Sequence, residues 1–194
     1  MAKLDINIKS SALLVMDCQI NILNFLAPSD KNRVLSNLAN VLKAARKSRM
    51  LIIYVVIAYR KGYPEVSVNN IHSSQSKNSG RLQAGAADTE ICPEIIPLPE
   101  EIIVTKKRIS AFTGSDLEVV LRSNKIDYLV LTGVSTLGVV ESTARFAVDM
   151  DYRLYILADC CADRVPEAND ITMTWVLPRI STVCTSGDFI SAIS

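Results

Sequence analysis

The chain has 194 residues, of which 21 are Lys or Arg, 20 are Asp or Glu and one is His. This length fits one domain over residues 1–194, and 49% hydrophobic with 21% charged residues argues against disorder. The net charge of +1 excludes a general electrostatic attraction to nucleic acid or to an anionic membrane. The single His72 excludes every site that requires two histidines.

The sequence predicts a cytoplasmic protein with reduced thiols. Residues 1–11 contain no apolar segment of the kind that a secretory signal requires. The longest apolar runs, such as residues 51–58, have the length of a strand and not of a membrane helix. The five cysteines are odd in number and include no CxxC pair, which argues against a disulfide framework.

Strand-like and helix-like segments alternate along the chain. Residues 11–17 form a nearly continuous apolar run, as in a central parallel strand that is covered on both faces. The other predicted strands are residues 50–58, 101–105, 128–132, 153–157 and 180–183. The predicted helices are residues 31–48, 115–124 (with a capping box at Ser115 and Glu118), 136–150, 167–176 and 187–193. Six strands alternating with helices predict a three-layer α/β/α sandwich with a mainly parallel six-stranded sheet.

A long polar segment, residues 59–90, separates the second and third predicted strands. It is rich in Ser, Asn and Gly and is predicted to be irregular. A loop of this length in a compact domain is often a lid or a binding loop, and an exposed excursion is the alternative. The sequence does not decide whether it closes over a site or reaches a neighbouring subunit.

Polar residues lie at the predicted carboxyl ends of three strands, where ligands bind in sheets of this kind. Asp17 ends the first strand, Lys106 follows the third, and the turn at residues 133–138 follows the fourth. A buried strand-end carboxylate tends to have a raised pKa, which suits a proton carrier, and a lysine can stabilise negative charge. The helix that begins near Thr136 is expected to direct free backbone N–H groups at the same space. A purely structural ion pair between Asp17 and Lys106 is the alternative.

Three motifs resemble those of the isochorismatase-like, or cysteine hydrolase, superfamily. They are LLVMDCQ at residues 13–19, VTKKRISAF at residues 104–112 and the long segment at residues 129–163, within a similarity that spans residues 11–188. The resemblance implies a three-layer α/β fold and hydrolysis of a small amide or vinyl ether without a redox cofactor. It also implies a homo-oligomer, either a dimer or a tetramer.

The resemblance also assigns residues to a site. Asp17 matches the catalytic aspartate of the superfamily, and Gln19 completes its D-x-Q signature and is expected to bind substrate. The K-x-x-x-S-A-F pattern selects Lys106 as the catalytic lysine. Its neighbour Lys107 is directed to the other face by strand alternation, where a solvated surface position is expected.

The turn after the fourth strand matches the superfamily in part. Val134 and Ser135 match the position of a cis peptide bond, and the hydroxyls of Ser135 and Thr136 are expected to bind substrate or cap the helix. The superfamily has its nucleophilic cysteine where this chain has Val139, or Gly138 if the turn contains a one-residue bulge. Neither residue can attack a substrate, so the thioester route of the amidase members is not expected.

Other candidate residues are weighed in the same way. The metal-binding Asp and histidines of nicotinamidase-like members are replaced by IAYR at residues 57–60, so we expect no catalytic metal. Arg60 and Arg108 are candidates for holding substrate carboxylates, because a guanidinium binds them bidentately. Tyr59 and Tyr63 are candidates for lining the pocket. Core or structural positions are expected for Cys18, Cys160 and Cys161, and an exposed loop position for His72.

Together these features predict an isochorismatase-like hydrolase of a small anionic molecule, with Asp17 as the general acid of a vinyl-ether hydrolysis. Lys106 would orient Asp17 or pair with a substrate carboxylate. Two alternatives remain: an amide hydrolase with a non-standard nucleophile or an activated water, and a catalytically silent relative that binds a metabolite or a partner protein. We expect a small-molecule substrate, no cofactor, and neither nucleic acid nor membrane as a partner.

Overall fold

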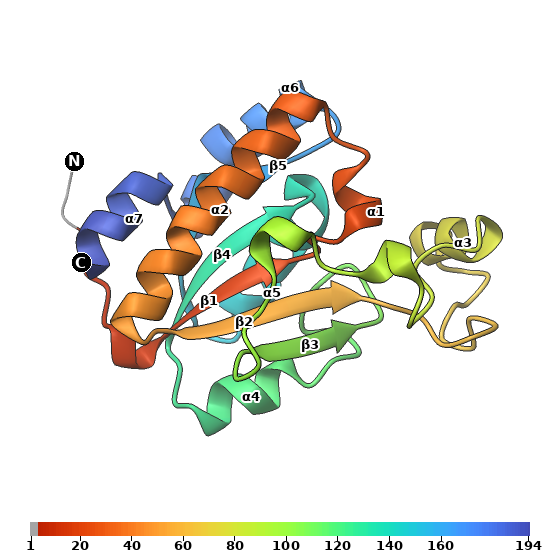
Figure 1. The fold of residues 1–194 in the computed structure, drawn as a ribbon, viewed down its shortest axis with the longest axis horizontal. Helices are drawn as coiled ribbons and strands as arrows, with labels where there is room; N and C mark the ends of the chain where they lie inside the picture. The colour runs from red at the N-terminus through yellow and green to blue at the C-terminus, as the bar shows by residue number, and fades with distance from the viewer. Residues whose placement is uncertain (1–3) are drawn as a thin grey trace.

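A six-stranded parallel sheet forms the centre of the molecule in the computed structural model, which describes residues 4–194 (Figure 1). Residues 1–3 of the predicted domain lie outside the described part. The strand order is β3-β2-β1-β4-β5-β6. The strands are β1 (Ser11–Met16), β2 (Leu51–Ile57), β3 (Ile102–Lys106), β4 (Tyr128–Val134), β5 (Arg153–Ala162) and β6 (Thr182–Cys184).

Helices cover both faces of this sheet. They are α1 (Ile20–Leu23), α2 (Pro28–Ser48), α3 (Ile71–Asn78), α4 (Leu117–Ser123), α5 (Glu141–Asp149), α6 (Pro166–Ile171) and α7 (Ser186–Ile193). α2 packs against β5 and α7 in front of the sheet in Figure 1, whereas α5 lies behind it. The predicted three-layer α/β/α sandwich is therefore confirmed. None of the described helices has the length and apolar character that crossing a membrane requires.

The central strand β1 shows how the sequence produces the layers. All of its residues are buried, because strands flank it on both sides and helices cover both faces. Leu13 and Val15 join the apolar cluster under α2, whereas Leu14 and Met16 join the cluster under α4 and α5. One apolar run therefore contributes to two cores and delivers Asp17 to the carboxyl edge of the sheet.

The capping box predicted at Ser115 and Glu118 does not form. α4 begins later, at Leu117, and its N-cap residue Asp116 makes no side-chain capping bond. The Ser115 hydroxyl instead donates to the Ala111 carbonyl at 2.6 Å, because the chain is still turning at this point. The spacing of the two residues is right for a capping box, but the helix starts one position too late to use it.

The segment at residues 59–90 was predicted to be irregular, but part of it forms the helix α3. The Asn70 side chain caps this helix by accepting a hydrogen bond from the Ser73 amide at 2.9 Å. Ser73 and Ser76 are the buried residues of α3, so the helix has no apolar stripe that would reveal it in the sequence. α3 lies beyond the carboxyl end of β2, at the right of Figure 1.

Candidate active site

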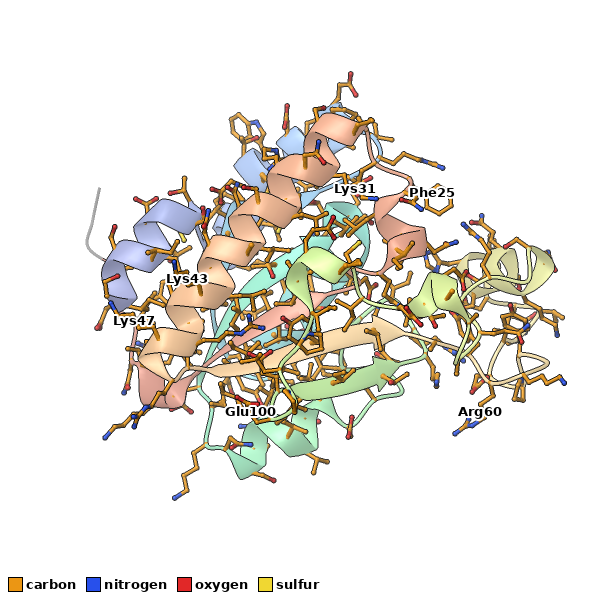
Figure 2. The ribbon with its side chains drawn as sticks, in the orientation of Figure 1. Phe25, Lys31, Lys43, Lys47, Arg60 and Glu100 are labelled. Atoms are coloured by element: carbon orange, nitrogen blue, oxygen red, sulfur yellow. The ribbon has the colours of Figure 1, made fainter. Side chains whose placement is uncertain are left out.

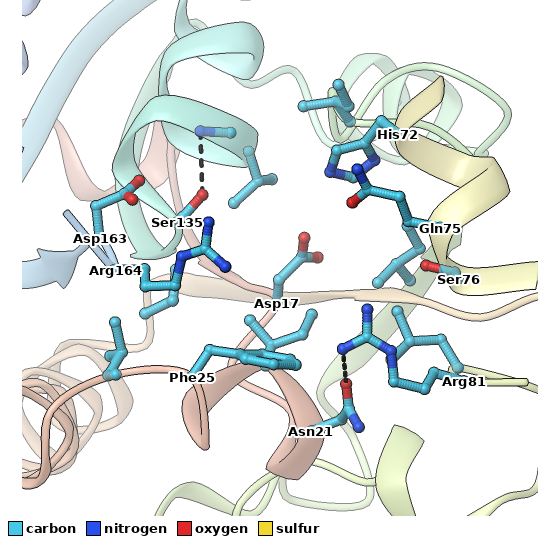
Figure 3. A pocket seen from close by; sticks show the side chains of 18 of the residues that line it. Asp17, Asn21, Phe25, His72, Gln75, Ser76, Arg81, Ser135, Asp163 and Arg164 are labelled. Atoms are coloured by element: carbon cyan, nitrogen blue, oxygen red, sulfur yellow. Dashed lines mark hydrogen bonds between the residues drawn. The ribbon is translucent and has the colours of Figure 1, made fainter. Parts of the chain in front are cut away.

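A cavity of about 350 Å³ lies at the carboxyl edge of the sheet, beside the ends of β1, β3 and β4. Side chains from α1, α3 and the turn after β4 surround it (Figure 3). Asp17 lies at the centre of this view. The position is the one where open parallel sheets generally bind their ligands.

Asp17 and Lys106 form a buried ion pair at the base of the cavity. Lys106 Nζ lies 2.8 Å from Asp17 Oδ2, and the lysine side chain is 1% exposed. Lys106 Nζ also donates to the carbonyl oxygens of Arg108 at 3.1 Å and Ile109 at 2.7 Å. A lysine ammonium has three N–H donors, so all of them are used within the protein. Lys106 can therefore orient Asp17 but has no donor left for a substrate carboxylate, which corrects the second role expected for it.

The other carboxyl oxygen of Asp17 has no partner in the described part of the chain. Asp17 Oδ1 is buried and has no hydrogen-bond partner within residues 4–194, and Figure 3 shows the carboxyl group pointing into the cavity. Burial raises the pKa of Asp17 above its usual value, and the Lys106 ammonium offsets part of this increase. A proton on this carboxyl group would lie next to a molecule bound in the cavity, which is the arrangement that general acid catalysis requires.

The turn after β4 brings a second set of residues to Asp17. The peptide bond between Val134 and Ser135 is cis, as the resemblance implies. Gly133 precedes it with φ at 134°, and a Cβ on this residue would collide with the Met16 carbonyl of β1. Only glycine therefore allows β4 to approach the end of β1 this closely, and the turn then directs Val134 and Ser135 at the cavity.

A π-helical turn, Thr136–Val140, follows in place of the regular helix start that the sequence predicts. The amide of Gly138 donates to Ser135 Oγ at 3.2 Å, and the amide of Leu137 donates to Asp163 Oδ2 at 3.0 Å. These two N–H groups are already bonded within the protein. The expectation that the helix start offers free N–H groups to an anion therefore does not hold for Leu137 and Gly138.

Val139 lines the cavity at the position where the resemblance implies a cysteine. All five cysteines belong to the described part of the chain, and none of them lines the cavity. Burial raises the pKa of Cys161 and of Cys184 to about 12, so both remain protonated at neutral pH. The cysteines therefore occupy structural positions, and an apolar side chain forms the wall next to Asp17.

Some of the predicted site residues come together and others do not. Gln19 is fully buried, and its side-chain amide donates to the carbonyls of Ile57 at 3.1 Å and Thr89 at 2.7 Å. The Thr136 hydroxyl donates to Asn169 Oδ1 at 2.7 Å. Gln19 and Thr136 therefore hold the structure around the cavity without lining it. The predicted residues that do line it are Asp17, Lys106, Val134, Ser135, Gly138 and Val139.

The structure does not bring Arg60 or Arg108 into the cavity. Arg60 is 72% exposed and pairs with Glu65 at 2.8 Å, and Figure 2 shows it at the outer edge of the molecule. Arg108 donates to the backbone carbonyls of Lys107 at 2.7 Å and Glu65 at 2.9 Å. Both guanidinium groups are thus engaged outside the cavity.

Three further residues near the site differ from expectation. Tyr59 and Tyr63 pack in a separate apolar cluster and do not line the cavity. Lys107 is half-buried and donates to the Ala58 carbonyl, whereas a solvated surface position was expected. Burial accordingly lowers the pKa of Lys107.

Sequence reasoning misses several lining side chains. His72 is exposed as expected, but it lies on α3 and not in a loop, and it lines the cavity together with Arg81 and Arg164 (Figure 3). Partial desolvation lowers the pKa of His72, with a smaller contribution from the Lys106 charge, which favours the neutral imidazole. The strand-end rule that finds Asp17 would also find Arg164 if β5 were predicted to reach Ala162. No three His, Cys, Asp or Glu side chains within the described range are grouped as metal ligands would be.

One family model matches most of the chain: the model described as "Isochorismatase domain" covers residues 11–188. The uncharacterized isochorismatase family protein YwoC of Bacillus subtilis is 30% identical over 194 residues, with 100% of this chain and 99% of that protein covered. An isochorismatase family protein from Burkholderia thailandensis has a TM-score of 0.84 at 26% identity, with 97% of each chain covered. N-carbamoylsarcosine amidase from Thermoplasma acidophilum has a TM-score of 0.72 at 26% identity, with 91% of this chain and 96% of that chain covered. The chain therefore belongs to the isochorismatase family, whose members are of the hydrolase type.

Proposed function

We propose that this protein hydrolyses the vinyl ether of a small anionic molecule, with Asp17 as the general acid. The observation that carries the proposal is the Asp17 carboxyl group, which points into the cavity while its Oδ1 is buried and unpartnered among residues 4–194. Burial raises the pKa of this carboxyl, which favours the protonated form that an acid catalyst needs. The absence of a cysteine from the cavity lining agrees with a reaction that uses no protein nucleophile.

The reaction begins when Asp17 transfers its proton to the terminal alkene carbon of the substrate. The ether oxygen shares the resulting positive charge as an oxocarbenium ion. Water adds to this cation and loses a proton, and the hemiketal collapses into a keto acid and an alcohol. The Asp17 carboxylate left after the first step is stabilised by Lys106 Nζ at 2.8 Å. Lys106 is therefore a positioning residue that also stabilises the charge developing on Asp17.

Val139 is compatible with this chemistry because no covalent intermediate is required. Its side chain forms an apolar part of the wall next to Asp17 and limits the access of water to that side. Exclusion of water helps to keep the carboxyl protonated, since desolvation disfavours the charged form. A cysteine at this position would serve a different route, the thioester route of amidases.

A second candidate is hydrolysis of a small amide, which the similarity to N-carbamoylsarcosine amidase favours. Without a cysteine in the cavity, this route would depend on a water activated by Asp17 as a carboxylate. The two candidates make opposite demands on Asp17, because the acid must start protonated and the base must start ionised. A catalytically silent relative would show tight binding of a metabolite without turnover.

Pyruvate release from isochorismate by the purified protein tests the proposal. The wild type is expected to release pyruvate, and Asp17→Asn is expected to lose at least about 1000-fold in kcat because the amide cannot donate the proton to carbon. Cys18→Ala serves as the control, since Cys18 is the chain neighbour of Asp17 and does not line the cavity. Thermal unfolding curves of both variants are measured to check that each protein is folded. Full activity of Asp17→Asn, or no pyruvate at high enzyme concentration, would contradict the proposed reaction on this substrate.

A further inference from the structure

The positive charge that a ligand can reach in the cavity comes from two arginines. Every N–H of Lys106 is used within the protein, so this ammonium has no donor to offer a ligand. Asp163 also lines the cavity, but its carboxylate accepts hydrogen bonds from two backbone amides at 3.0 and 3.4 Å. Arg81 and Arg164 remain as the lining side chains with charged N–H donors to offer.

Arg81 is held in place by its neighbours before a ligand binds. Its Nε donates to the Ser79 hydroxyl at 2.9 Å, and its Nη1 donates to Asn21 Oδ1 at 3.4 Å. Its guanidinium also lies over the ring of Phe25, 4.8 Å from the centroid. Figure 3 shows the other terminal nitrogen of Arg81 pointing into the cavity. A cation fixed in this way loses little side-chain entropy when an anion binds.

Arg164 approaches the cavity from the other side of Asp17 (Figure 3). It follows β5, whereas Arg81 follows α3, so separate parts of the fold deliver the two guanidinium groups. Arg164 forms no ion pair with any residue of the range 4–194. Figure 3 also shows no hydrogen bond from it to the other lining side chains that are drawn. Its donors are therefore open to a ligand.

We propose that the cavity binds its substrate through two separate anionic groups, one at Arg81 and the other at Arg164, with the reacting atoms between them at Asp17. A guanidinium binds a carboxylate through two parallel hydrogen bonds, so each arginine fixes orientation as well as charge. The neutral His72 adds a polar contact without a third cation. The inference rests on the proposed function in taking this cavity as the substrate site, and it narrows the substrate to small dicarboxylates.

The experiment measures the binding of unreactive carboxylates by titration calorimetry. The probes are benzoate, with one carboxylate, and phthalate, isophthalate and terephthalate, with two carboxylates at increasing separation. The variants are Arg81→Gln and Arg164→Gln, and Arg145→Gln is the matched control. Arg145 is an exposed arginine of α5 that pairs with Glu141 at 2.9 Å and does not line the cavity. Arg164 is exposed, so its replacement puts the fold at little risk, and thermal unfolding checks each variant.

At least one dicarboxylate is expected to bind the wild type 10-fold or more tightly than benzoate. Each cavity variant is expected to lower the affinity for that dicarboxylate by about 10- to 100-fold, the effect of losing a charge-assisted pair. Each is also expected to reduce the preference over benzoate, whereas Arg145→Gln keeps both affinities. Equal binding of benzoate and all dicarboxylates, no dicarboxylate binding, or unchanged affinity in both cavity variants would overturn the inference.

Failure of this inference can be told apart from failure of the proposed function. The probes contain no vinyl ether or amide, so their binding does not depend on Asp17 chemistry. Dicarboxylate selectivity without pyruvate release would leave the two-anion site standing and reject the reaction. Turnover of isochorismate that survives in both arginine variants with unchanged KM would reject the two-anion site and leave the reaction standing.

Discussion

At the scale of single residues, the ammonium of Lys106 has two opposing effects on Asp17. It holds the carboxyl group in position at 2.8 Å, and its charge lowers the pKa that burial raises. Because burial is the larger effect, the acid keeps its proton to a higher pH than an exposed aspartate. The same ammonium then stabilises the carboxylate that proton transfer leaves behind. The interaction with Lys106 can therefore position the acid before proton transfer and stabilise the carboxylate after it.

The direction of the pKa shift predicts the pH dependence of the reaction. A carboxyl group with a raised pKa is protonated below that pKa, so acid catalysis by Asp17 is fully present there and declines as the pH rises through it. The logarithm of kcat/KM is therefore expected to fall with a slope of about −1 on the alkaline side, with a midpoint above 3.8, the ordinary value for aspartate. Stopped assays over a pH series measure this limb. A rate that rises with pH over the same range would indicate a base and support the amide route instead.

A local rule can predict some of these residues but not others. Asp17 and Lys106 are found from the sequence because each lies at the carboxyl end of a strand, and these ends meet at one edge of a parallel sheet. Arg81 is not found, because its place depends on the path of a polar segment that no apolar pattern reveals. Gln19 is misread as a substrate contact, because a signature in sequence does not show that both ends of its amide are already bonded to backbone.

At the scale of secondary-structure elements, α3 depends on its cap more than on its packing. Few of its side chains are buried, so tertiary contacts contribute little to its stability. The Asn70 side chain satisfies the Ser73 amide at the start of the helix. The helix nevertheless carries His72 and Gln75 to the cavity wall. The wall on this side is therefore formed by a weakly anchored element.

Asn70→Ala is expected to cost about 1 kcal/mol of local stability at α3. Since α3 lines the cavity and none of its described residues forms a hydrogen bond or ion pair with Asp17 or Lys106, KM is expected to rise severalfold while kcat changes little. Steady-state kinetics and hydrogen exchange of residues 71–78 measure the two effects. Thr185→Ala is the matched control, because it removes the N-cap of α7 at the other end of the molecule (Figure 1). An equal rise of KM in both variants would show that the effect does not come from the cavity wall.

At the scale of the whole molecule, the layered architecture follows from the alternation of strands and helices, but the strand order does not. The sequence of a single strand does not specify which strands it pairs with in the sheet. The nearly continuous apolar run of β1 indicates its central place, because an edge strand would expose part of its length. The end of β5 is also hidden from the sequence, because the shift in its pairing with β4 between Leu131 and Gly133 carries the strand on to Ala162.

We also propose that the chain forms a homo-oligomer, either a dimer or a tetramer. Trp175 is 76% exposed and Ile171 is 58% exposed, one helical turn apart, and such exposed apolar groups are typical of subunit interfaces. Trp175→Glu is expected to shift the assembly towards the monomer because a charge would be buried there. Light scattering after gel filtration measures the mass, and Val119→Glu on α4, where Val119 is 67% exposed, is the control. A monomeric wild type would contradict the proposal.

The side-chain amide of Gln19 anchors both ends of a long segment whose sequence can vary. It bonds the backbone at Ile57, where the chain leaves the sheet, and at Thr89, shortly before it returns. The Gln19 side chain therefore fixes both ends of the long segment between Ile57 and Thr89. Closing a longer loop costs only slightly more entropy than closing a shorter one. Insertions and substitutions within this segment can therefore change which ligands the cavity binds, while the sheet keeps Asp17 and Lys106 in place.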